Sequence, residues 1–445
     1  PARRGNILTR DGEPLATSLF RYQVEMDYGS PGFDSLRTFR EQSDSLAKLL
    51  ALYFRDKSAA AYAQAMQREH TRRYRVTYRK DTLVPRSEGG LARWWDRMRG
   101  EEFLTVKLYD TLRDHTPVAL FPREIDYTEW QTLRRYPILN WNMGMTYRLR
   151  ERDERVYPQG ELARRTIGQV GDKGNYGVEY VLRDVLEGRD GKARRQRIAR
   201  GFYGRVVGGD NSEPEDGLDV VTTLDLEMQD VADRALRRQL EAQNALWGTA
   251  LVMEVATGDL LAMANLSRTK SGAYAEVKNH ALSSRMEPGS TFKLAALLAL
   301  VDDAGMSLDE TFDTGNGARV KVGRTTVQDS HGLPPLNLKD AVAHSSNVFF
   351  ARAVYETYKD DPERYVDYLR HLHLDRTVGL EEFGAVAPIF PAPGMKIWYP
   401  DVSIVNMGYG YAIELTPLHT LTLYNAVAND GCMVAPRLVR EIRRG

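Results

Sequence analysis

The residues with the clearest chemical potential lie in the segment MEPGSTFK, at residues 286–293. Ser290 is followed three positions later by Lys293, and residues three apart lie on the same face of a helix. A serine hydroxyl can act as a nucleophile when a neutral amine within hydrogen-bond reach accepts its proton. The same Ser-x-x-Lys spacing also occurs at Ser45–Lys48 and at Ser267–Lys270, so the spacing alone does not identify a site.

The context of Ser290 distinguishes it from the other two serines. A Pro-Gly pair precedes it, and the following segment FKLAALLALV is apolar on every side except at Lys293, which predicts a helix packed centrally in its domain. Burial disfavours the ammonium form and lowers the pKa of a lysine, which suits a general base. The alternative is a helix start whose lysine extends to the surface. By contrast, Lys48 falls in an ordinary amphipathic pattern and Lys270 in a polar loop.

A second polar motif, AHSSNVFF at residues 343–350, lies between two helical patterns. Ser345 and Asn347 precede an apolar helix, and the simplest interpretation is that they cap it. The functional interpretation is a hydroxyl and an amide that point into a cleft beside Ser290. Ser345 would then relay a proton to a leaving amine. Asn347 would bind a substrate amide and help to orient Lys293.

The composition excludes several other classes of function. The 445 residues are 42% hydrophobic and 27% charged, which is enough for two or more domains with their own cores. The formal net charge is zero, so no global basic field favours nucleic acid. The single cysteine, Cys432, excludes an internal disulfide and a cysteine-rich metal site. Neither an HExxH motif nor a P-loop is present, and we therefore predict no metal and no cofactor.

In the first half of the chain, residues 34–135 contain few turn signals. Residues 1–30 predict short strands around a turn at RDGE, residues 10–13, and residues 34–135 have helical spacing. The segment GGDNSEPEDGLD, at 208–219, combines glycine, proline and acids with almost no apolar residue. We therefore predict a domain boundary there.

The second half begins with a predicted helix and a predicted hairpin. Asp225 is placed to cap the helix. Apolar residues at i, i+3, i+4 and i+7 are predicted to share one face of it: Met228, Val231, Ala232, Ala235, Leu236 and Leu240. Two apolar runs in residues 248–266 flank Ala-Thr-Gly-Asp, which predicts a β-hairpin with one buried face.

These motifs, in this order, resemble the penicillin-binding proteins, the acyl-serine D,D-transpeptidases, for which Ser-x-x-Lys is one of the shared motifs. RRGNILTRDGEPLATS at 3–18 is similar to the opening of class B members, and the segments at 156–171, 176–191 and 408–431 are similar to later blocks of that class. The segments DGLDVVTTLD, VMEVATGDLLAMANL and NMGYGYAIELTPLHTLTLYNAVAND are most similar to the division-specific, FtsI-like enzyme of the Bacteroidetes type.

The resemblance implies an α/β (α+β) fold with two parts. An elongated α+β pedestal, similar to a dimerisation domain, is expected at 1–215, and a transpeptidase domain of the penicillin-binding-protein and β-lactamase type at 216–445. The implied reaction is attack by Ser290 on a D-Ala-D-Ala stem peptide, release of D-Ala, and acyl transfer to an amine of a neighbouring strand. Lys293 is the implied general base, and no metal or cofactor takes part.

The resemblance also implies a cellular setting. The expected role is cross-linking of peptidoglycan in septal cell-wall synthesis. The expected partners are peptidoglycan stem peptides, β-lactams, a membrane glycosyltransferase and division proteins, and no nucleic acid. The expected location is the periplasmic face of the inner membrane, with an N-terminal transmembrane anchor that is absent from this chain.

One departure from the family pattern concerns the third motif, Lys-Thr/Ser-Gly on a strand. It is expected some tens of residues after the segment ANDG, whereas the chain ends at Gly445. A Lys-Ser-Gly at 270–272 precedes Ser290 and is expected in a loop. We therefore expect a transpeptidase domain truncated before that strand, with the hairpin at 248–266 as a two-stranded remnant of a larger sheet. The sequence leaves open whether this chain is active.

Other functions remain open at this point. An elongation-type class B transpeptidase would carry the same motifs. A β-lactamase or carboxypeptidase would share the acylation and use water as acceptor, but the long pedestal argues against a β-lactamase. A β-lactam sensor would need a signalling domain, and none is visible. In its truncated form the chain could also be a non-catalytic scaffold of the division complex. Nothing in 1–215 resembles a glycosyltransferase, which argues against a bifunctional class A enzyme.

Overall fold

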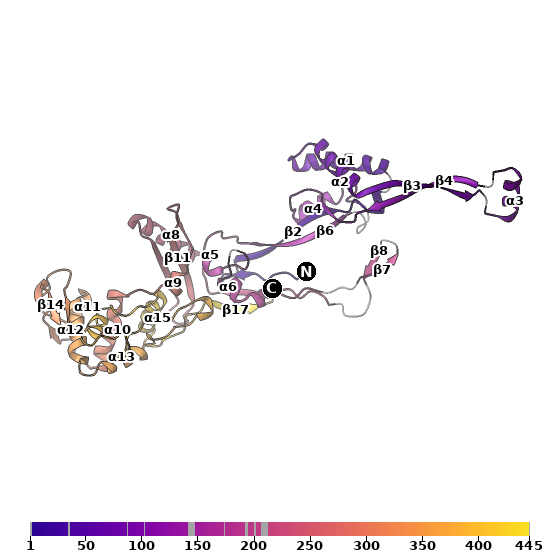
Figure 1. Cartoon of the computed structure of the whole chain (residues 1–445). Coiled ribbons are helices and arrows are strands. Elements are labelled where there is room, and N and C mark those ends of the chain that lie inside the picture. The colour runs from indigo at the N-terminus through magenta and orange to yellow at the C-terminus, as the bar shows by residue number, and fades with distance from the viewer. Residues whose placement is uncertain are drawn as a thin grey trace. The chain divides into compact units, whose positions relative to one another are not determined.

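The structure is a computed structural model that describes residues 2–33, 36–86, 88–101, 103–140, 147–172, 174–191, 195–199, 202–205 and 212–444. The chain forms two compact units (Figure 1). The first unit contains residues 1–17, 155–190 and 214–445, and the second contains residues 18–154 and 191–213. Residues 208–211 of the predicted linker lie outside the described residues.

A sheet in the first unit joins segments that are distant in sequence. Strand β1 (Ile7–Leu8) pairs antiparallel with the start of β2 (Pro14–Met26) and parallel with β9 (Asp219–Thr222). Strand β17 (Val439–Arg443) pairs antiparallel with the other edge of β9. Between β1 and β2 the chain turns at Gly12, whose φ of 92° favours glycine. The predicted strands around the RDGE turn are therefore confirmed.

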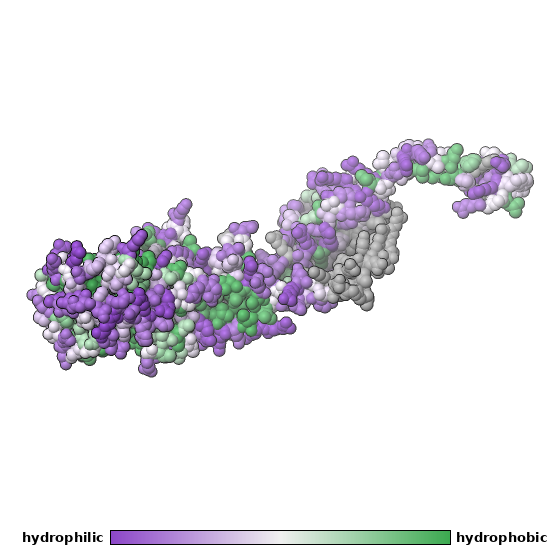
Figure 2. All heavy atoms as spheres, turned by 60° about the horizontal axis from the view of Figure 1, so that its bottom comes forward, coloured by the Kyte–Doolittle hydropathy of each residue, from purple (hydrophilic) through white to green (hydrophobic). Residues whose placement is uncertain are grey.

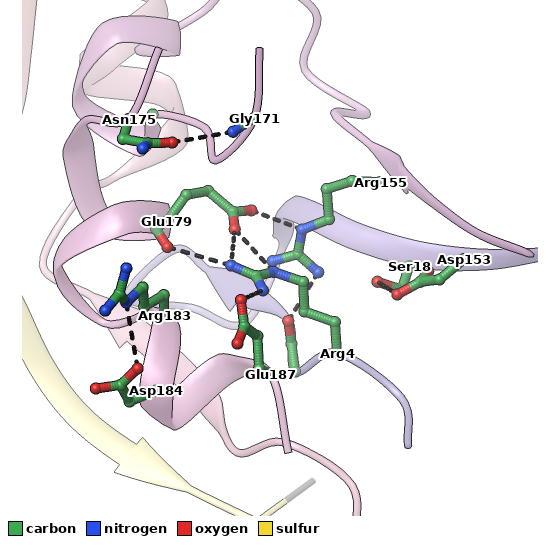
Figure 3. A network of polar contacts seen from close by, with 12 residues as sticks. Arg4, Ser18, Asp153, Arg155, Gly171, Asn175, Glu179, Arg183, Asp184 and Glu187 are labelled. Atoms are coloured by element: carbon green, nitrogen blue, oxygen red, sulfur yellow. Dashed lines mark hydrogen bonds and ion pairs between the residues drawn. The ribbon is translucent and has the colours of Figure 1, made fainter. Parts of the chain in front are cut away.

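A buried carboxylate stabilises the first residues of this unit. Three short helices, α5 (Arg164–Ile167), α6 (Gly177–Val181) and α7 (Arg183–Leu186), pack here, and α6 carries Glu179. Glu179 is 1% exposed and lies between two guanidinium groups (Figure 3). Its Oε2 accepts from Arg4 Nη2 at 2.9 Å and its Oε1 from Arg155 Nε at 2.6 Å. Arg155 Nη1 also donates to the Gly5 carbonyl at 2.8 Å, so this cluster ties β1 to α6.

Removing the charge of Glu179 should destabilise the first unit strongly. The change Glu179→Gln leaves the guanidinium groups of Arg4 and Arg155 without their buried counter-charge, and breaking a buried ion pair in this way costs about 3–5 kcal/mol. Glu187 also pairs with Arg4, but its side chain is 54% exposed. Glu187→Gln is therefore the control, with an expected cost of about 1 kcal/mol or less. Urea denaturation of both variants measures the difference, and equal losses would contradict this account.

The predicted helix and hairpin after the linker are present. Helix α8 (Leu226–Gln243) begins at Asp225, whose side chain accepts from the Met228 N–H at 3.0 Å. Strands β10 (Trp247–Met253) and β11 (Leu260–Arg268) form the hairpin. A third strand, β12 (Tyr274–Ala275), pairs with β11, so the expected two-stranded remnant is corrected to a three-stranded sheet. The Lys-Ser-Gly at 270–272 forms the turn before β12, as expected for a loop.

Two details of this prediction were wrong. The helix face was predicted to include Met228, Val231 and Ala235, but all three side chains are exposed. The apolar contacts of α8 with the sheet come from Ala232, Leu236 and Leu240. Strand β11 is buried on both faces rather than one. Ala262 and Ala264 pack against α8, whereas Met263 packs with Leu282 of helix α9 (His280–Ser283). A strand that is covered on both faces has a continuous apolar sequence rather than an alternating one.

Helices surround a hydrophobic core in the part of the first unit that follows α9 (Figure 1). Buried aromatic and aliphatic side chains such as Phe292, Phe349, Tyr358 and Tyr365 fill its centre. Its helices are α10 (Lys293–Leu298), α11 (Leu338–Ala343), α12 (Asn347–Tyr358), α13 (Pro362–His371), α14 (Ser403–Met407) and α15 (Pro417–Ala428). Two small antiparallel sheets accompany them: β13 (Thr311–Phe312) pairs with β16 (Leu336–Asn337), and the hairpin of β14 (Val320–Val322) and β15 (Thr325–Val327) lies between them in sequence.

The second unit is helical around a small core. Helices α1 (Leu36–Phe54), α2 (Ala59–Arg73) and α4 (Tyr127–Leu133) bury Leu46, Leu50 and Trp130, among others. The end of β2 pairs here with β5 (Val118–Ala119) and β6 (Tyr147–Val156). A short hairpin of β7 (Arg195–Ala199) and β8 (Phe202–Arg205) belongs to the same unit.

The expectation of helical structure throughout 34–135 was wrong for its middle third. Strands β3 (Tyr74–Pro85) and β4 (Phe103–Arg113) form a long hairpin that projects from α1, α2 and α4 and carries helix α3 (Gly90–Met98) at its far end (Figure 1). Cross-strand pairs such as Tyr78↔Tyr109 stabilise it. Among the helices in the described ranges, none combines the length and the apolar composition needed to cross a membrane.

Candidate active site

The turn that carries Ser290 is held by two glycines. A single 3-10 turn, Gly289–Phe292, leads directly into α10, and Phe292 at 1% exposure anchors it in the core. Gly289 has a φ of +56° and its N–H donates to the Gly410 carbonyl at 2.9 Å. A Cβ on Gly410 would lie 1.8 Å from the Gly289 carbonyl oxygen, so only glycine allows this approach. Ser290 itself stays exposed at the surface of the turn.

The predicted helix after Ser290 is shorter than the apolar run indicates. Helix α10 begins at Lys293, covers only residues 293–298, and continues as one π-helical turn at Ala299–Asp303. Lys293 is nevertheless buried, at 5% exposure. The prediction that Lys293 lies in a buried helix is therefore confirmed, and the alternative of a lysine extended to the surface is excluded.

The Lys293 amine brings both sequence motifs together. Its Nζ lies 3.1 Å from Ser290 Oγ, 3.0 Å from Ser345 Oγ and 2.7 Å from Asn347 Oδ1. It also donates to the Ser345 carbonyl at 2.5 Å. Four acceptors thus surround a group that carries three protons when charged. Burial lowers the pKa of Lys293 to about 8, although the negative charge of Asp329 partly opposes that shift.

The Ser345–Asn347 turn depends on a residue that the sequence analysis missed. Ser345 adopts a left-handed φ of 52°, and the N-cap of α12 is Ser346 rather than Ser345 or Asn347. The Asp329 carboxylate, 6% exposed, accepts from the Ser346 hydroxyl at 2.8 Å and from the Asn347 N–H at 2.5 Å. A carboxylate at the start of a helix also stabilises the helix dipole. The capping of α12 leaves the side chains of Ser345 and Asn347 directed at Lys293.

The segment after α14 forms a wall beside Ser290. The Ala412 N–H donates to Glu287 Oε1 at 3.0 Å, and Met286 forms a β-bridge with Leu415. The Tyr424 hydroxyl donates to the Thr291 carbonyl at 3.0 Å. From the sequence, this segment was predicted to contain a helix capped at Thr416-Pro417, without any contact to the Ser290 turn. Its role is to fix both sides of the Ser290 turn.

A hollow of about 390 Å³ opens next to Asn347. Its lining is mostly polar and contains one carboxylate and two tyrosines: Glu287, Thr326, Val327, Gln328, Asn347, Asn406, Tyr409 and Tyr411. The Tyr409 hydroxyl donates to Asn406 Oδ1 at 3.1 Å, which orients that amide. The hollow is open to solvent, and its amides and hydroxyls suit hydrogen bonds to a peptide.

The arrangement has the parts of a serine nucleophile with an amine base. An exposed hydroxyl, a second hydroxyl and an amide each lie within hydrogen-bond reach of one buried amine of lowered pKa. Among the residues that the structure describes, no cluster of histidine, cysteine and carboxylate side chains could hold a metal ion.

Two family models match the chain. The model of the penicillin-binding protein transpeptidase domain matches residues 248–444, and the model of the penicillin-binding protein dimerisation domain matches residues 1–222. Penicillin-binding protein PbpB of Mycobacterium tuberculosis is 30% identical over 305 residues, which are 65% of this chain and 43% of that protein. The probable peptidoglycan D,D-transpeptidase PenA of Neisseria meningitidis is 27% identical over 292 residues, 63% of this chain and 48% of PenA. The chain thus spans somewhat under half the length of these relatives.

Solved structures share the fold across nearly the whole chain. Penicillin Binding Protein 2X from Streptococcus thermophilus matches with a TM-score of 0.69 and 20% identity, over 99% of this chain and 60% of that one. Penicillin binding protein 3 from M. tuberculosis, complexed with ampicillin, matches with a TM-score of 0.59 and 20% identity, over 99% of this chain and 67% of that one. The mixed α/β architecture predicted from the sequence is therefore confirmed.

Proposed function

This chain belongs to the class B penicillin-binding proteins, and on that premise we propose that it is a serine-type peptidoglycan D,D-transpeptidase. The observation that carries the proposal is the position of Lys293 Nζ, 3.1 Å from Ser290 Oγ and 3.0 Å from Ser345 Oγ. One amine in contact with two hydroxyls can take a proton from the first and return one through the second. The names of the relatives, which include D,D-transpeptidases, support the same reaction.

The proposed roles follow from these contacts. Ser290 Oγ attacks the carbonyl carbon between the two D-Ala residues of a stem peptide, and its proton passes to the neutral Lys293 amine. When the tetrahedral intermediate collapses, the C–N bond breaks, and the proton returns from Lys293 through Ser345 to the leaving D-Ala amine. The resulting ester on Ser290 is attacked by an amine of a neighbouring peptide, which forms the cross-link and restores the serine. Asn347 orients Lys293 and binds the substrate amide.

The test of this function is covalent labelling by a penicillin. We expect intact-mass spectrometry to show one adduct, and peptide mapping to place it on Ser290. The chain offers matched controls, because Ser45→Ala and Ser267→Ala change the two other Ser-x-x-Lys pairs. These variants should label fully, whereas Ser290→Ala should not label. If neither this chain nor a longer one with a Lys-Thr-Gly segment is acylated, the transpeptidase proposal is wrong.

The acylation rate should rise with pH through the pKa of Lys293 and level off above about pH 9. Only the neutral Lys293 amine accepts the serine proton, and burial lowers its pKa to about 8. Raising the pH from 6 to 7 should therefore increase the second-order acylation rate about tenfold, with little further increase above pH 9. An ordinary lysine would not level off below pH 10. A fluorescent penicillin measures the profile, and a flat profile from pH 6 to 9 would exclude Lys293 as the base.

The proposal extends to the domain bounds, the cellular role, the partners and the location of the protein. We assign the pedestal to residues 1–215 and the transpeptidase domain to 216–445. Septal rather than elongation-type synthesis is supported by the sequence segments similar to division-specific enzymes. That role entails a membrane glycosyltransferase and division proteins as partners, on the periplasmic side of an inner membrane to which an N-terminal helix anchors the protein. Depletion in cells distinguishes the roles, because loss of a septal enzyme gives filaments and loss of an elongation enzyme gives rounded cells.

A further inference from the structure

Helix α3 carries an apolar face that nothing in the described part of the chain covers. The helix lies at the far end of the β3–β4 hairpin (Figure 1), and none of its residues is buried. Four apolar residues recur at i, i+3, i+4 and i+7 and so form one stripe. They are Leu91, Trp94, Trp95 and Met98, with 79%, 52%, 53% and 67% of their surface exposed. Arg93, Asp96 and Arg97 occupy the opposite side of the helix.

A hollow beside this helix combines two arginines with aromatic rings. Its volume is about 320 Å³, and it lies between α3 and the ends of β3 and β4. It is lined by Pro85, Gly90, Arg93, Trp94, Arg97 and Phe103. Arg93 and Arg97 are one turn apart on the helix, and the fork of donors on a guanidinium group matches the oxygens of a phosphate. An ion pair between Arg86 and Glu101 closes the base of this loop.

The hairpin is positively charged in a chain that is neutral overall. Residues 74–113 contain nine Lys and Arg against six Asp and Glu, whereas the whole chain has 61 of each. Apolar patches also appear among the polar ones along the arm (Figure 2). The local excess of basic residues favours an anionic occupant over a second copy of the same arm, because two such arms repel each other.

The size of the stripe favours a lipid surface over a protein. Four side chains on a nine-residue helix expose roughly 500 Å² of apolar surface, whereas a stable protein–protein interface buries about 800 Å² on each partner. A bilayer needs no such area, because tryptophan lies well at the level of the lipid headgroups. Arginine side chains on the polar side of such a helix extend towards the phosphates.

We propose that α3 is an interfacial helix that binds an anionic phospholipid surface. Trp94 and Trp95 enter the headgroup region together with Leu91 and Met98, and the hollow at Arg93 and Arg97 takes a lipid phosphate. A helix this short binds weakly and reversibly, so it adds to another attachment rather than replacing it. This inference goes beyond the proposed function and does not depend on the chemistry of Ser290.

Vesicle flotation of the full chain tests the proposal. The vesicles contain phosphatidylcholine alone or phosphatidylcholine mixed with phosphatidylglycerol. We expect about tenfold more wild-type protein than W94S/W95S on the mixed vesicles, and quenching of tryptophan fluorescence by brominated lipid in the wild type only. The variant R93Q/R97Q should lose the preference for phosphatidylglycerol. Leu52→Ser is the control, because Leu52 is 69% exposed on α1 of the same unit and lies outside the stripe.

Any of three results would overturn the proposal. If wild type fails to float with mixed vesicles, or if W94S/W95S floats as well as wild type, the stripe belongs to a protein partner. If wild type binds both kinds of vesicle equally, α3 does not select an anionic lipid surface. Circular dichroism checks that the variants are folded. Penicillin labelling of Ser290 is recorded on the same samples, so failure of the transpeptidase proposal shows separately from failure of vesicle binding.

Discussion

Replacing Lys293 by Met is expected to slow acylation of Ser290 by a penicillin about 10²–10⁴-fold, the usual contribution of a general base. Methionine keeps the length of the side chain and removes the amine that contacts Ser290, Ser345 and Asn347. The serine hydroxyl then has no partner to take its proton. Stopped-flow measurement with a fluorescent penicillin gives the rate, and a thermal melt shows whether the fold is intact. A buried amine of lowered pKa costs stability, so we expect Lys293→Met to melt no lower than wild type.

The chain supplies its own controls for this experiment. Lys48 and Lys270 follow serines at the same spacing, and both are exposed. Lys48→Met and Lys270→Met should therefore acylate at the wild-type rate. If Lys293→Met also acylates at that rate while folded, the proton must leave Ser290 by another route, and the proposed role of the lysine fails.

Replacing Asp329 by Ala is expected to destabilise the first unit by about 2–4 kcal/mol, because hydrogen bonds to a buried charged group contribute about 1.5–3 kcal/mol each. The Asp329 carboxylate accepts from the Ser346 hydroxyl and from the N–H groups of Asn347 and Val348. Without it, the buried start of α12 loses its acceptor. Asn347 should then lose its position beside Lys293, so acylation should also slow by at least tenfold. Urea denaturation and labelling kinetics measure the two effects on one sample.

Asp340 provides the control for the Asp329 variant. Asp340 lies in the first turn of α11, where it also favours the helix dipole, but its side chain is exposed. Asp340→Ala should cost about 1 kcal/mol or less and leave acylation unchanged. Equal behaviour of the two variants would mean that Asp329 only caps α12 and has no part in positioning Asn347.

Sequence patterns predicted those parts of the site that are local. Ser290 and Lys293 lie within one turn of each other, and the context of a buried helix was visible in the apolar residues that follow them. Asp225 as a helix cap was equally local. The role of Asp329 could not be predicted from local patterns, because its partners lie 17 to 19 residues further along the chain. Nothing in the sequence pattern indicates that distance. The contact of Gly410 with Gly289 spans still more sequence, and only the fold reveals it.

The long hairpin shows why a different part of the fold was missed. Strands β3 and β4 contain Arg, Lys and Leu at positions that also fit a helix, and their alternation is interrupted by a bulge between Tyr78 and Lys80. Strand formation here depends on the partner strand rather than on intrinsic preference. Similarly, Met228, Val231 and Ala235 fit the helical period and yet remain exposed, because α8 makes its apolar contacts with the sheet through Ala232, Leu236 and Leu240.

The parallel pairing of β1 with β9 has a consequence for the order in which the chain folds. Ile7 is opposite Val220, 213 positions later in the sequence, so this contact closes a very long loop. Residues 18–154 are continuous in sequence and can collapse first, whereas β1 has no parallel partner until the chain has been synthesised past residue 222. Contacts of such high sequence separation form slowly. During that delay the apolar edge at Ile7 and Leu8 is open to pairing with other chains, which makes it the stage of folding most exposed to aggregation.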